Sequence, residues 1–285
     1  MKQVNKDLFA GRDIVIATMH KKEEVIAPLL SLHLGLKPFA CSGINTDLLG
    51  SFSGEIKRLS DPLETARKKC MMGMEQSGCS LGIASEGSFG SHPAILFGCV
   101  NEEWVVLIDA ENKFEISHRV ITMETNFMGR TVQNREELLE FAQKAQFPIH
   151  KLTLKDSEHD PRKIKKGIGA PKSLLNWFDK FQKANLSIWV ETDMRAMSNP
   201  TRMGVIRKAT EGLINKAKSK CPSCLFPGFS VSRMSPGLPC EACGFPTESI
   251  LIHHYECKYC GHSEDKENPD GLLMADPMHC GICNP

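Results

Sequence analysis

The chain has 285 residues, of which 41% are hydrophobic and 24% are charged, and its formal net charge is +1. These values are typical of a globular protein, and the length allows one large domain and a small one. The balanced charge gives no general attraction to nucleic acid or to an anionic membrane. No apolar run approaches the roughly 18 residues that span a bilayer, and the N-terminus lacks the apolar segment of a secretory signal. We therefore expect a cytoplasmic protein with no membrane association.

The N-terminal part predicts a strand, a turn and a helix. Residues 13–18 form a β-branched run that indicates a buried strand, and the apolar stripe after it indicates a helix that ends at Gly35. Lysines and backbone N–H groups in the turn between them, residues 19–22, suit an anion, although a solvated turn is the commoner case. Residues 36–60 contain several glycines and small polar residues and predict an irregular lid or specificity loop.

Residues 60–90 bring two carboxylates into one helix and one strand. Asp61 predicts a helix N-cap, followed by proline at the first helical position. Glu64, three residues later, is either the second member of a capping box or a metal ligand on the first turn. The strand at 81–84 leads Glu86 into a glycine-flanked turn at its C-terminal end. We expect the two carboxylates to share a divalent metal ion, with a cap and a turn carboxylate as the simpler explanation.

Strands and helices then alternate as far as residue 219. We expect a hairpin of strands 94–100 and 104–109 around a turn at 101–103, further strands at 114–123, 149–154 and 186–191, and helices that begin at Asn134, Pro171 and Asn199. The pattern predicts a three-layer α/β domain with a mixed, partly antiparallel sheet. The basic stretch 151–172 is expected to be a solvated loop, with a phosphate contact as the alternative.

The tail contains the strongest chemical signal of the chain. Eight of the 12 cysteines follow residue 220, and all eight stand in CxxC pairs. Such pairs in a reducing compartment indicate metal rather than disulfides, and four thiolates suit a structural, tetrahedral zinc ion. We expect an α/β domain, residues 1–219, and a small zinc-ribbon domain, residues 220–285. Two structural Zn²⁺ ions would be held by Cys221, Cys224, Cys240, Cys243, Cys257, Cys260, Cys280 and Cys283.

Two pairings of these cysteines are open. Sequential pairing joins the first four and the last four, because spacers of 15 and 19 residues match the pattern C-x₂-C-x₁₅₋₂₀-C-x₂-C, and we assign this pairing. An interleaved cross-brace is the alternative, since only 13 residues separate Cys243 from Cys257. From Lys218 to the end, eight acids stand against five Lys or Arg, which argues against a ribbon that holds nucleic acid by charge alone.

Several short motifs follow one another along the chain in an order that can be compared with known families. They are Ile14-Val-Ile-Ala-Thr18 with the turn to Lys22, Glu64-Thr-Ala66-x-x-Lys69, Gly82-Ile-Ala-Ser-Glu86-Gly87, Trp104-Val-Val with Ser117-His118-Arg119, and Thr201-Arg202. In this order they resemble the inosine triphosphate pyrophosphatase-like superfamily, and within it the inosine/xanthosine triphosphatase branch. The resemblance covers residues 8 to about 217, and the zinc tail lies outside it.

The resemblance implies Mg²⁺-dependent hydrolysis of a non-canonical purine nucleoside triphosphate or a related phosphorylated nucleotide. It implies catalytic roles for Glu64, Glu86 and Lys69, with the two glutamates as ligands of Mg²⁺. It implies that the substrate is bound by Thr18, Lys22, Arg119 and Arg202. The expected partner is thus a small-molecule nucleotide, and a homodimer is compatible with this reading.

A second function is a non-catalytic protein that binds a nucleotide or acts as a scaffold, whose zinc tail binds a protein or RNA partner. Two features favour it: His20 stands where the family carries Asn, and the tail holds two CxxC quartets. Nucleic acid would then be bound only through the tail.

Overall fold

The computed structural model describes residues 8–41, 43–44, 61–91, 99–159, 161–184 and 187–285. It divides into two compact units, one of which is Phe9–Ile214 and the other of which contains Asn215–Pro285. Within the part of the chain described, no helix combines the length and the apolar character needed to cross a bilayer.

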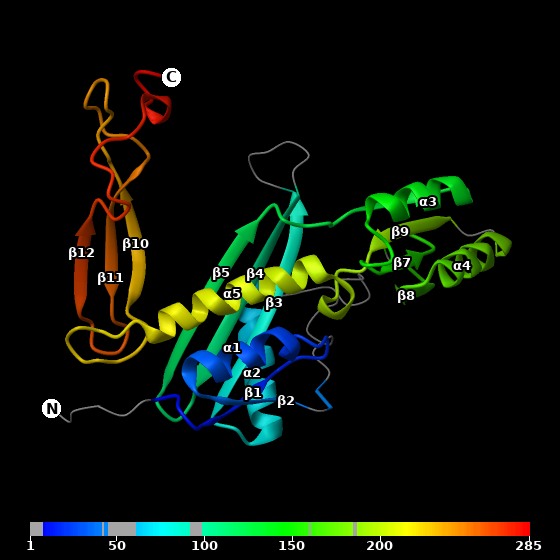
Figure 1. Cartoon of the computed structure of the whole chain (residues 1–285), viewed down its shortest axis with the longest axis horizontal. Coiled ribbons are helices and arrows are strands. Elements are labelled where there is room, and N and C mark those ends of the chain that lie inside the picture. Colours follow the sequence, from blue (N-terminus) through cyan, green and yellow to red (C-terminus); the bar gives the residue numbers. More distant parts are fainter. Residues whose placement is uncertain (1–7, 42, 45–60, 92–98, 160, 185–186) are drawn as a thin grey trace. The chain divides into compact units, whose positions relative to one another are not determined.

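A five-stranded mixed sheet forms the first part of the α/β unit, in the order β2-β1-β3-β4-β5. β1 pairs in parallel with β2 and β3, whereas β3, β4 and β5 are antiparallel neighbours (Figure 1). The strands are β1 (Asp13–Ile16), β2 (Lys37–Ala40), β3 (Leu81–Ser91), β4 (Cys99–Asp109) and β5 (Phe114–Thr122). The predicted mixed, partly antiparallel sheet is confirmed.

Helices cover both faces of this sheet. Ala84 and Val106 face α2 (Pro62–Ser77) and form one buried cluster with its residues Ala66 and Cys70. Neighbouring residues of a strand point to opposite faces, and on the other face α5 (Pro200–Lys218) approaches β5, where a Cβ on Gly212 would lie 2.2 Å from His118. The three-layer α/β architecture is confirmed. α1 (Glu23–Leu34) connects β1 to β2.

The start of α2 follows the predicted local chemistry. The Asp61 side chain accepts a hydrogen bond from the backbone N–H of Glu64, and proline occupies the first turn. The helix ends at Gly78, whose φ of 69° lies in the left-handed region.

Residues 129–192 form a second, antiparallel sheet in the order β6-β9-β7-β8. Its strands are β6 (Gly129–Val132), β7 (Leu152–Lys155), β8 (Ile164–Ile168) and β9 (Ile188–Thr192), and its helices are α3 (Arg135–Lys144) and α4 (Pro171–Lys183). Leu138, Phe141, Phe178 and Phe181 belong to the buried core of this part. The solvated loop expected at 151–172 is therefore wrong in part, because this range contains all of β7 and β8 and the start of α4.

The C-terminal unit contains a three-stranded antiparallel sheet in the order β10-β11-β12. Its strands are β10 (Ser230–Pro236), β11 (Ile250–Glu256) and β12 (Ser263–Glu267), and a short 3₁₀ turn, η3 (Pro277–His279), follows.

Two predicted turns of the α/β unit are wrong. β3 continues to Ser91, so Glu86 lies inside the strand, and the turn expected at 101–103 is the middle of β4. The two glutamates are tolerated there because they have partners: Glu102 accepts hydrogen bonds from Ser88 and from the Trp104 ring nitrogen, and Glu103 pairs with Arg202. β2 was not anticipated within 36–60; most of that predicted lid, and residues 94–98 of the predicted hairpin, lie outside the described residues.

Gly82→Ala should lower the free energy of unfolding. A Cβ at Gly82 would lie 2.6 Å from Cγ of Met74 and 2.9 Å from Sγ of Cys70, so the contact between β3 and α2 must open. We expect a loss of about 2 kcal/mol, in the range of overpacked cores, measured by urea unfolding. The matched control is Gly90→Ala on the same strand, where a Cβ meets no atom within 4 Å. Equal unfolding free energies for the two variants would contradict this packing.

Candidate functional site

The site lies where the chain changes direction across the five-stranded sheet. From β1 the chain first goes to β2 on one side and then returns past β1 to β3 on the other side. In an open α/β sheet such a switch point leaves a crevice at the carboxyl ends of the strands. The last parallel pair of β1 and β3 is Ile16 with Ile83, so Ser85 and Glu86 extend beyond the end of β1. The turn after β1 and the middle of β3 therefore meet at this point.

The turn after β1 is tightly built. The backbone N–H of His20 donates to Oγ1 of Thr18 over 3.1 Å, and Lys21 has a φ of 58°. Thr18 and Lys22 are both buried. Nζ of Lys22 donates to the carbonyl oxygen of Ser85 over 2.7 Å and to its Oγ over 2.9 Å. The turn thus places a lysine ammonium at the crevice.

Burial and neighbouring cations lower two pKa values here. The pKa of Lys22 falls to about 7, chiefly because the ammonium is desolvated and secondly because Arg202 is near. The pKa of His20 falls to about 3, first through burial and then through Lys22 and Arg202. His20 is therefore neutral at pH 7, and the depressed pKa of Lys22 reflects chiefly the loss of water around a buried ammonium.

Glu86 and Lys69 form a buried ion pair. Nζ of Lys69 on α2 lies 2.6 Å from Oε2 of Glu86 on β3, and both side chains are less than a tenth exposed. The structure thus brings together two of the three predicted catalytic residues.

A second buried pair joins α5 to β4. Nε of Arg202 lies 3.2 Å from Oε2 of Glu103, both side chains are fully buried, and Nη1 of Arg202 donates to the carbonyl of Met194 over 2.7 Å. Lys22 lies 3.8 Å from the other oxygen of Glu103. A Cβ on Gly87 would lie 2.2 Å from Oε2 of Glu103, so only glycine leaves room for this pair. Arg202 was predicted as a substrate ligand, whereas Glu103 was missed because it was assigned to a turn.

Other polar groups near this network were also missed. Asp193 pairs with Arg195 over 2.6 Å, and this arginine is among the cations that lower the pKa of His20. Asn101 on β4, two residues before Glu103, is 1% exposed, and neither atom of its amide has a hydrogen-bond partner among the described residues. Unpaired buried polar atoms are rare because each costs about 1–3 kcal/mol. No local sequence signal marks Asn101, since its burial follows from the strand pairing.

Two other predicted residues have different surroundings. Glu64 is 45% exposed and pairs with Arg67, which also binds Glu115 over 2.8 Å. Arg119 is 47% exposed, lies 2.6 Å from Glu102, and its guanidinium stands over the Trp104 ring. Glu64 and Glu86 thus have different cationic partners, and their shared Mg²⁺ site stays a prediction.

Among the described residues, side chains that could hold a metal ion in groups of three or more occur as two cysteine tetrads. The first is Cys221, Cys224, Cys257 and Cys260, and the second is Cys240, Cys243, Cys280 and Cys283. Within each tetrad the ligand atoms lie within 4.8 Å of one another. The sequential pairing is therefore wrong, and the interleaved cross-brace is the observed arrangement.

The strand order of the C-terminal unit explains this pairing. β10 and β11 are antiparallel, with Ser230 opposite Glu256 at one end and Pro236 opposite Ile250 at the other. The first and third CxxC pairs therefore meet at one end of the sheet. β12 runs back along β11, which carries the fourth pair to the end where the second pair lies.

The sulfur positions suit zinc. The separations of Sγ atoms across the tetrads are 3.7 Å for Cys221 with Cys260, 3.7 Å for Cys224 with Cys257 and 3.6 Å for Cys243 with Cys280. A tetrahedron with Zn–S bonds of about 2.3 Å has edges of about 3.8 Å. Four thiolates around one ion leave no open position, so both tetrads are suited to structural zinc.

Comparison with known proteins gives one family match. The model of the family described as Domain of unknown function (DUF6671) matches residues 69–285, which include Lys69, Glu86, Arg202 and both tetrads. No curated protein matches the chain.

The interleaved pairing predicts how many zinc ions remain when two cysteines are replaced. Cys221→Ser with Cys257→Ser changes one tetrad only, so we expect the purified double variant to retain about one of two zinc ions per chain. Cys221→Ser with Cys240→Ser changes both tetrads and should retain less. Elemental analysis of both variants measures this, and sequential pairing would give the reverse order.

The low pKa of Lys22 predicts pH-dependent anion binding. Sulfate has a constant charge between pH 6 and 8, whereas Lys22 loses its proton near pH 7. We expect sulfate affinity to fall about tenfold from pH 6 to pH 8 because the protonated fraction falls by that factor. Isothermal titration measures the affinity. Lys22→Met should abolish the dependence, and Lys21→Met, at a mostly exposed neighbouring lysine, should keep it. A flat profile for the unchanged protein would contradict the assignment.

Proposed function

The chain belongs to the DUF6671 family, and we propose that its α/β unit hydrolyses a nucleoside triphosphate of the non-canonical purine type, or a related phosphorylated nucleotide, with Mg²⁺. The observation that carries this proposal is the buried Lys22 at the carboxyl end of β1, beside three buried or half-buried ion pairs. The resemblance of the motif order to inosine triphosphate pyrophosphatase-like enzymes supports the same reaction.

The charge balance of the site favours a phosphate ligand. Three carboxylates of the site already have a cationic partner: Glu86 has Lys69, Glu103 has Arg202 and Asp193 has Arg195. Lys22 is a fourth cation, and its desolvation is incompletely offset, as its low pKa indicates. An anionic phosphate at the crevice would stabilise its charged form. The backbone N–H groups at the N-terminus of the 12-residue helix α1, directly after Lys22, attract an anion, whereas Glu23 and Glu24 in its first turn oppose one.

In this proposal the residues of the site have different roles in binding and hydrolysis. Thr18 and Lys22 bind the phosphate chain, and Arg202 holds Glu103 and the Met194 carbonyl in position at its edge. When Lys69 turns to a phosphate oxygen, Glu86 is released and can accept a proton from an attacking water. The water oxygen forms a bond to phosphorus while the phosphoanhydride bond breaks, and Lys69 offsets charge on the leaving phosphate. The unpaired amide of Asn101 can donate to and accept from a polar group of the substrate.

Mg²⁺ would neutralise phosphate charge, and its predicted ligands are Glu64 and Glu86. Their oxygen atoms suit the ion, but each carboxylate is engaged by a cation, Arg67 or Lys69. The two glutamates therefore do not form a ready-made metal site, and no step above depends on one.

A non-catalytic nucleotide-binding protein is the second candidate. The ion pair between Lys69 and Glu86 favours it, because Lys69, at 2.6 Å, already binds the carboxylate that would act as the base. Turnover and binding must therefore be measured separately.

The test is release of phosphate and pyrophosphate from a panel of canonical and deaminated nucleoside triphosphates by the zinc-loaded full chain, with and without Mg²⁺. We expect Mg²⁺-dependent turnover of at least one of them. Glu86→Gln should reduce kcat by about 10²–10⁴-fold, as for loss of a general base, and Lys22→Met should mainly raise KM. The matched control, Lys113→Met, removes an exposed lysine far along the chain and should leave both unchanged.

Binding measured on the same panel separates the two candidates. Nucleotide binding that depends on Lys22, without turnover of any nucleotide, would contradict the enzyme and favour the non-catalytic nucleotide-binding protein. If the protein neither binds nor turns over any nucleotide of the panel, both candidate functions are excluded.

A further inference from the structure

The C-terminal unit has a pocket that zinc binding does not explain. Its volume is about 370 Å³, within the size range of ligand sites. It is lined by side chains of Leu238, Ile250, Leu272, Ala275, Asp270 and Asp276, among others. The cysteines of the second tetrad are not among its lining residues. The pocket is thus a surface feature beside the metal centre rather than part of it.

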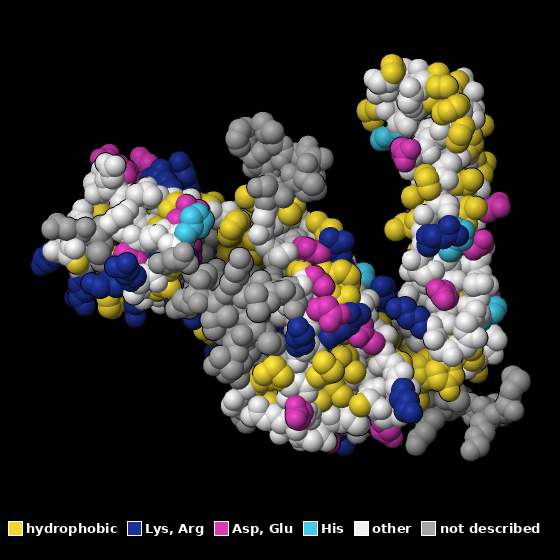
Figure 2. Space-filling model, turned by 180° about the vertical axis from the view of Figure 1, so that it is seen from behind, with side chains coloured by type: hydrophobic (Ala, Val, Ile, Leu, Met, Phe, Trp, Pro, Cys, Tyr) yellow, Lys and Arg dark blue, Asp and Glu magenta, His cyan; other side chains and the backbone are white. Residues whose placement is uncertain are grey.

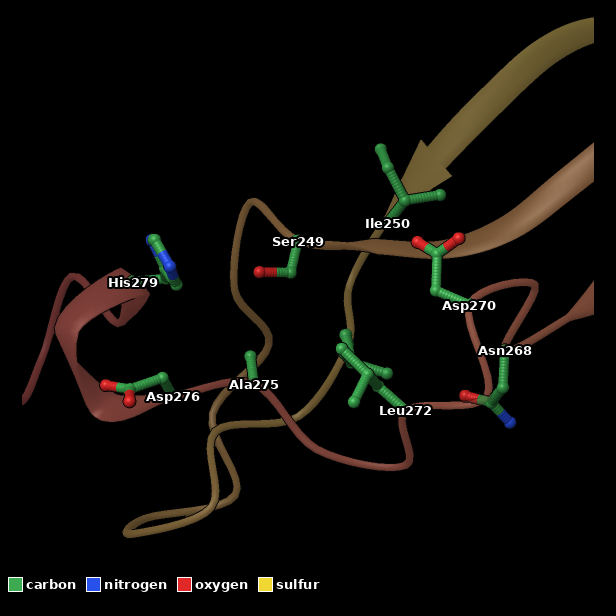
Figure 3. A pocket seen from close by; sticks show the side chains of 9 residues that line it. Ser249, Ile250, Asn268, Asp270, Leu272, Ala275, Asp276 and His279 are labelled. Carbon is green, nitrogen blue, oxygen red and sulfur yellow. The ribbon is translucent and has the colours of Figure 1, made fainter.

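The pocket has an apolar middle and an acidic group at either end. Figure 3 shows Leu272 and Ala275 between Asp270, on the loop after β12, and Asp276, at the start of η3. Asp276 caps η3 by accepting from the backbone N–H of Met278 over 2.8 Å, which fixes its position. Among the described residues that line the pocket, none is Lys or Arg. The lining therefore suits a ligand with an apolar centre and positive charge on either side.

The surface around the pocket is unusually apolar. Hydrophobic side chains (yellow) gather at this end of the C-terminal unit in Figure 2. More than half of each of these side chains is exposed: Leu272, Leu273, Met274, Met278 and Ile282. These five residues lie within eleven consecutive positions, 272–282, and none of them is a zinc ligand or part of a strand. Contiguous exposed apolar surface beside a polar rim marks interaction sites in soluble proteins.

The charge of the unit decides which class of partner fits. From Asn215 onward there are eight acids and six Lys or Arg, and two of the acids, Asp270 and Asp276, line the pocket. Phosphate-bearing nucleic acid would be repelled, whereas a basic protein segment would be attracted. We propose that this end of the C-terminal unit is a docking site for a partner protein, through a segment in which an apolar side chain is flanked by lysine or arginine. The proposal is independent of catalysis in the α/β unit.

The test uses the zinc-loaded full chain and two fluorescein-labelled peptides, GGKLKGG and GGQLQGG, in a fluorescence anisotropy titration. We expect the lysine peptide to bind about tenfold more tightly, because two exposed ion pairs contribute up to about fivefold each. Its affinity should fall as salt rises, since charges at a surface are screened.

Variants of the protein locate the binding. Asp270→Asn with Asp276→Asn should remove the preference for lysine; asparagine keeps the helix cap, so the fold is retained. Leu272→Ser should weaken both peptides. The matched control Asp265→Asn removes one acid of β12 that pairs with His254 instead of lining the pocket, and should bind as the unchanged protein does.

Four outcomes of the binding measurements would overturn the proposal. They are equal affinity for the two peptides, no binding of either, binding that survives the Asp270 and Asp276 changes, and tighter binding of a single-stranded RNA oligonucleotide than of the lysine peptide. A dimer in sedimentation that is lost in Leu272→Ser would also overturn it, by assigning the surface to a second copy of the chain.

Discussion

The buried ion pair between Glu103 and Arg202 is the interaction on which the α/β unit most depends. The two residues are 99 positions apart, and neither side chain is exposed. Removing one partner of such a pair leaves an uncompensated buried charge, which destabilises a protein by about 3–5 kcal/mol. Because Arg202 stands near the start of α5 and Glu103 in the middle of β4, the pair fixes that helix against one face of the sheet. Position 87 requires glycine for the same reason, since a Cβ there would clash with the side chains of Glu103 and Arg202.

The pair also sets the electrostatics of the crevice beside it. Both carboxylate oxygens of Glu103 accept from Arg202, and one of them, Oε1, also lies 3.8 Å from Nζ of Lys22. Burial is the main cause of the lowered pKa of Lys22, and the nearby Arg202 lowers it further, whereas the charge of Glu103 raises it. On the opposite face of the sheet, Lys69 and Glu86 attach α2 to β3 in the same manner. The ion pairs therefore have two consequences: they hold both helical layers on the sheet, and they leave excess positive charge at the switch point.

The C-terminal unit is stabilised in a different way. Its sheet has three strands and little buried apolar surface besides the cysteines, Phe226, Phe229 and Leu238. Two tetrads at opposite ends of antiparallel strands can replace a hydrophobic core, because each would join two segments that are distant in the chain. Apolar side chains that are not needed inside are then available at the surface, where they surround the pocket at the second tetrad.

The sequence by itself determined the α/β class, the N-cap at Asp61, the helices and the eight-cysteine metal set. These depend on periodicity, capping and spacing, which are local. The tertiary structure alone decided that Glu86 and Glu103 lie inside strands, that Glu64 turns to Arg67, and which cysteines share a tetrad. The reason is physical. Polar residues that indicate a turn are stable in a strand when a distant side chain compensates them, and the order of antiparallel strands determines which metal ligands meet.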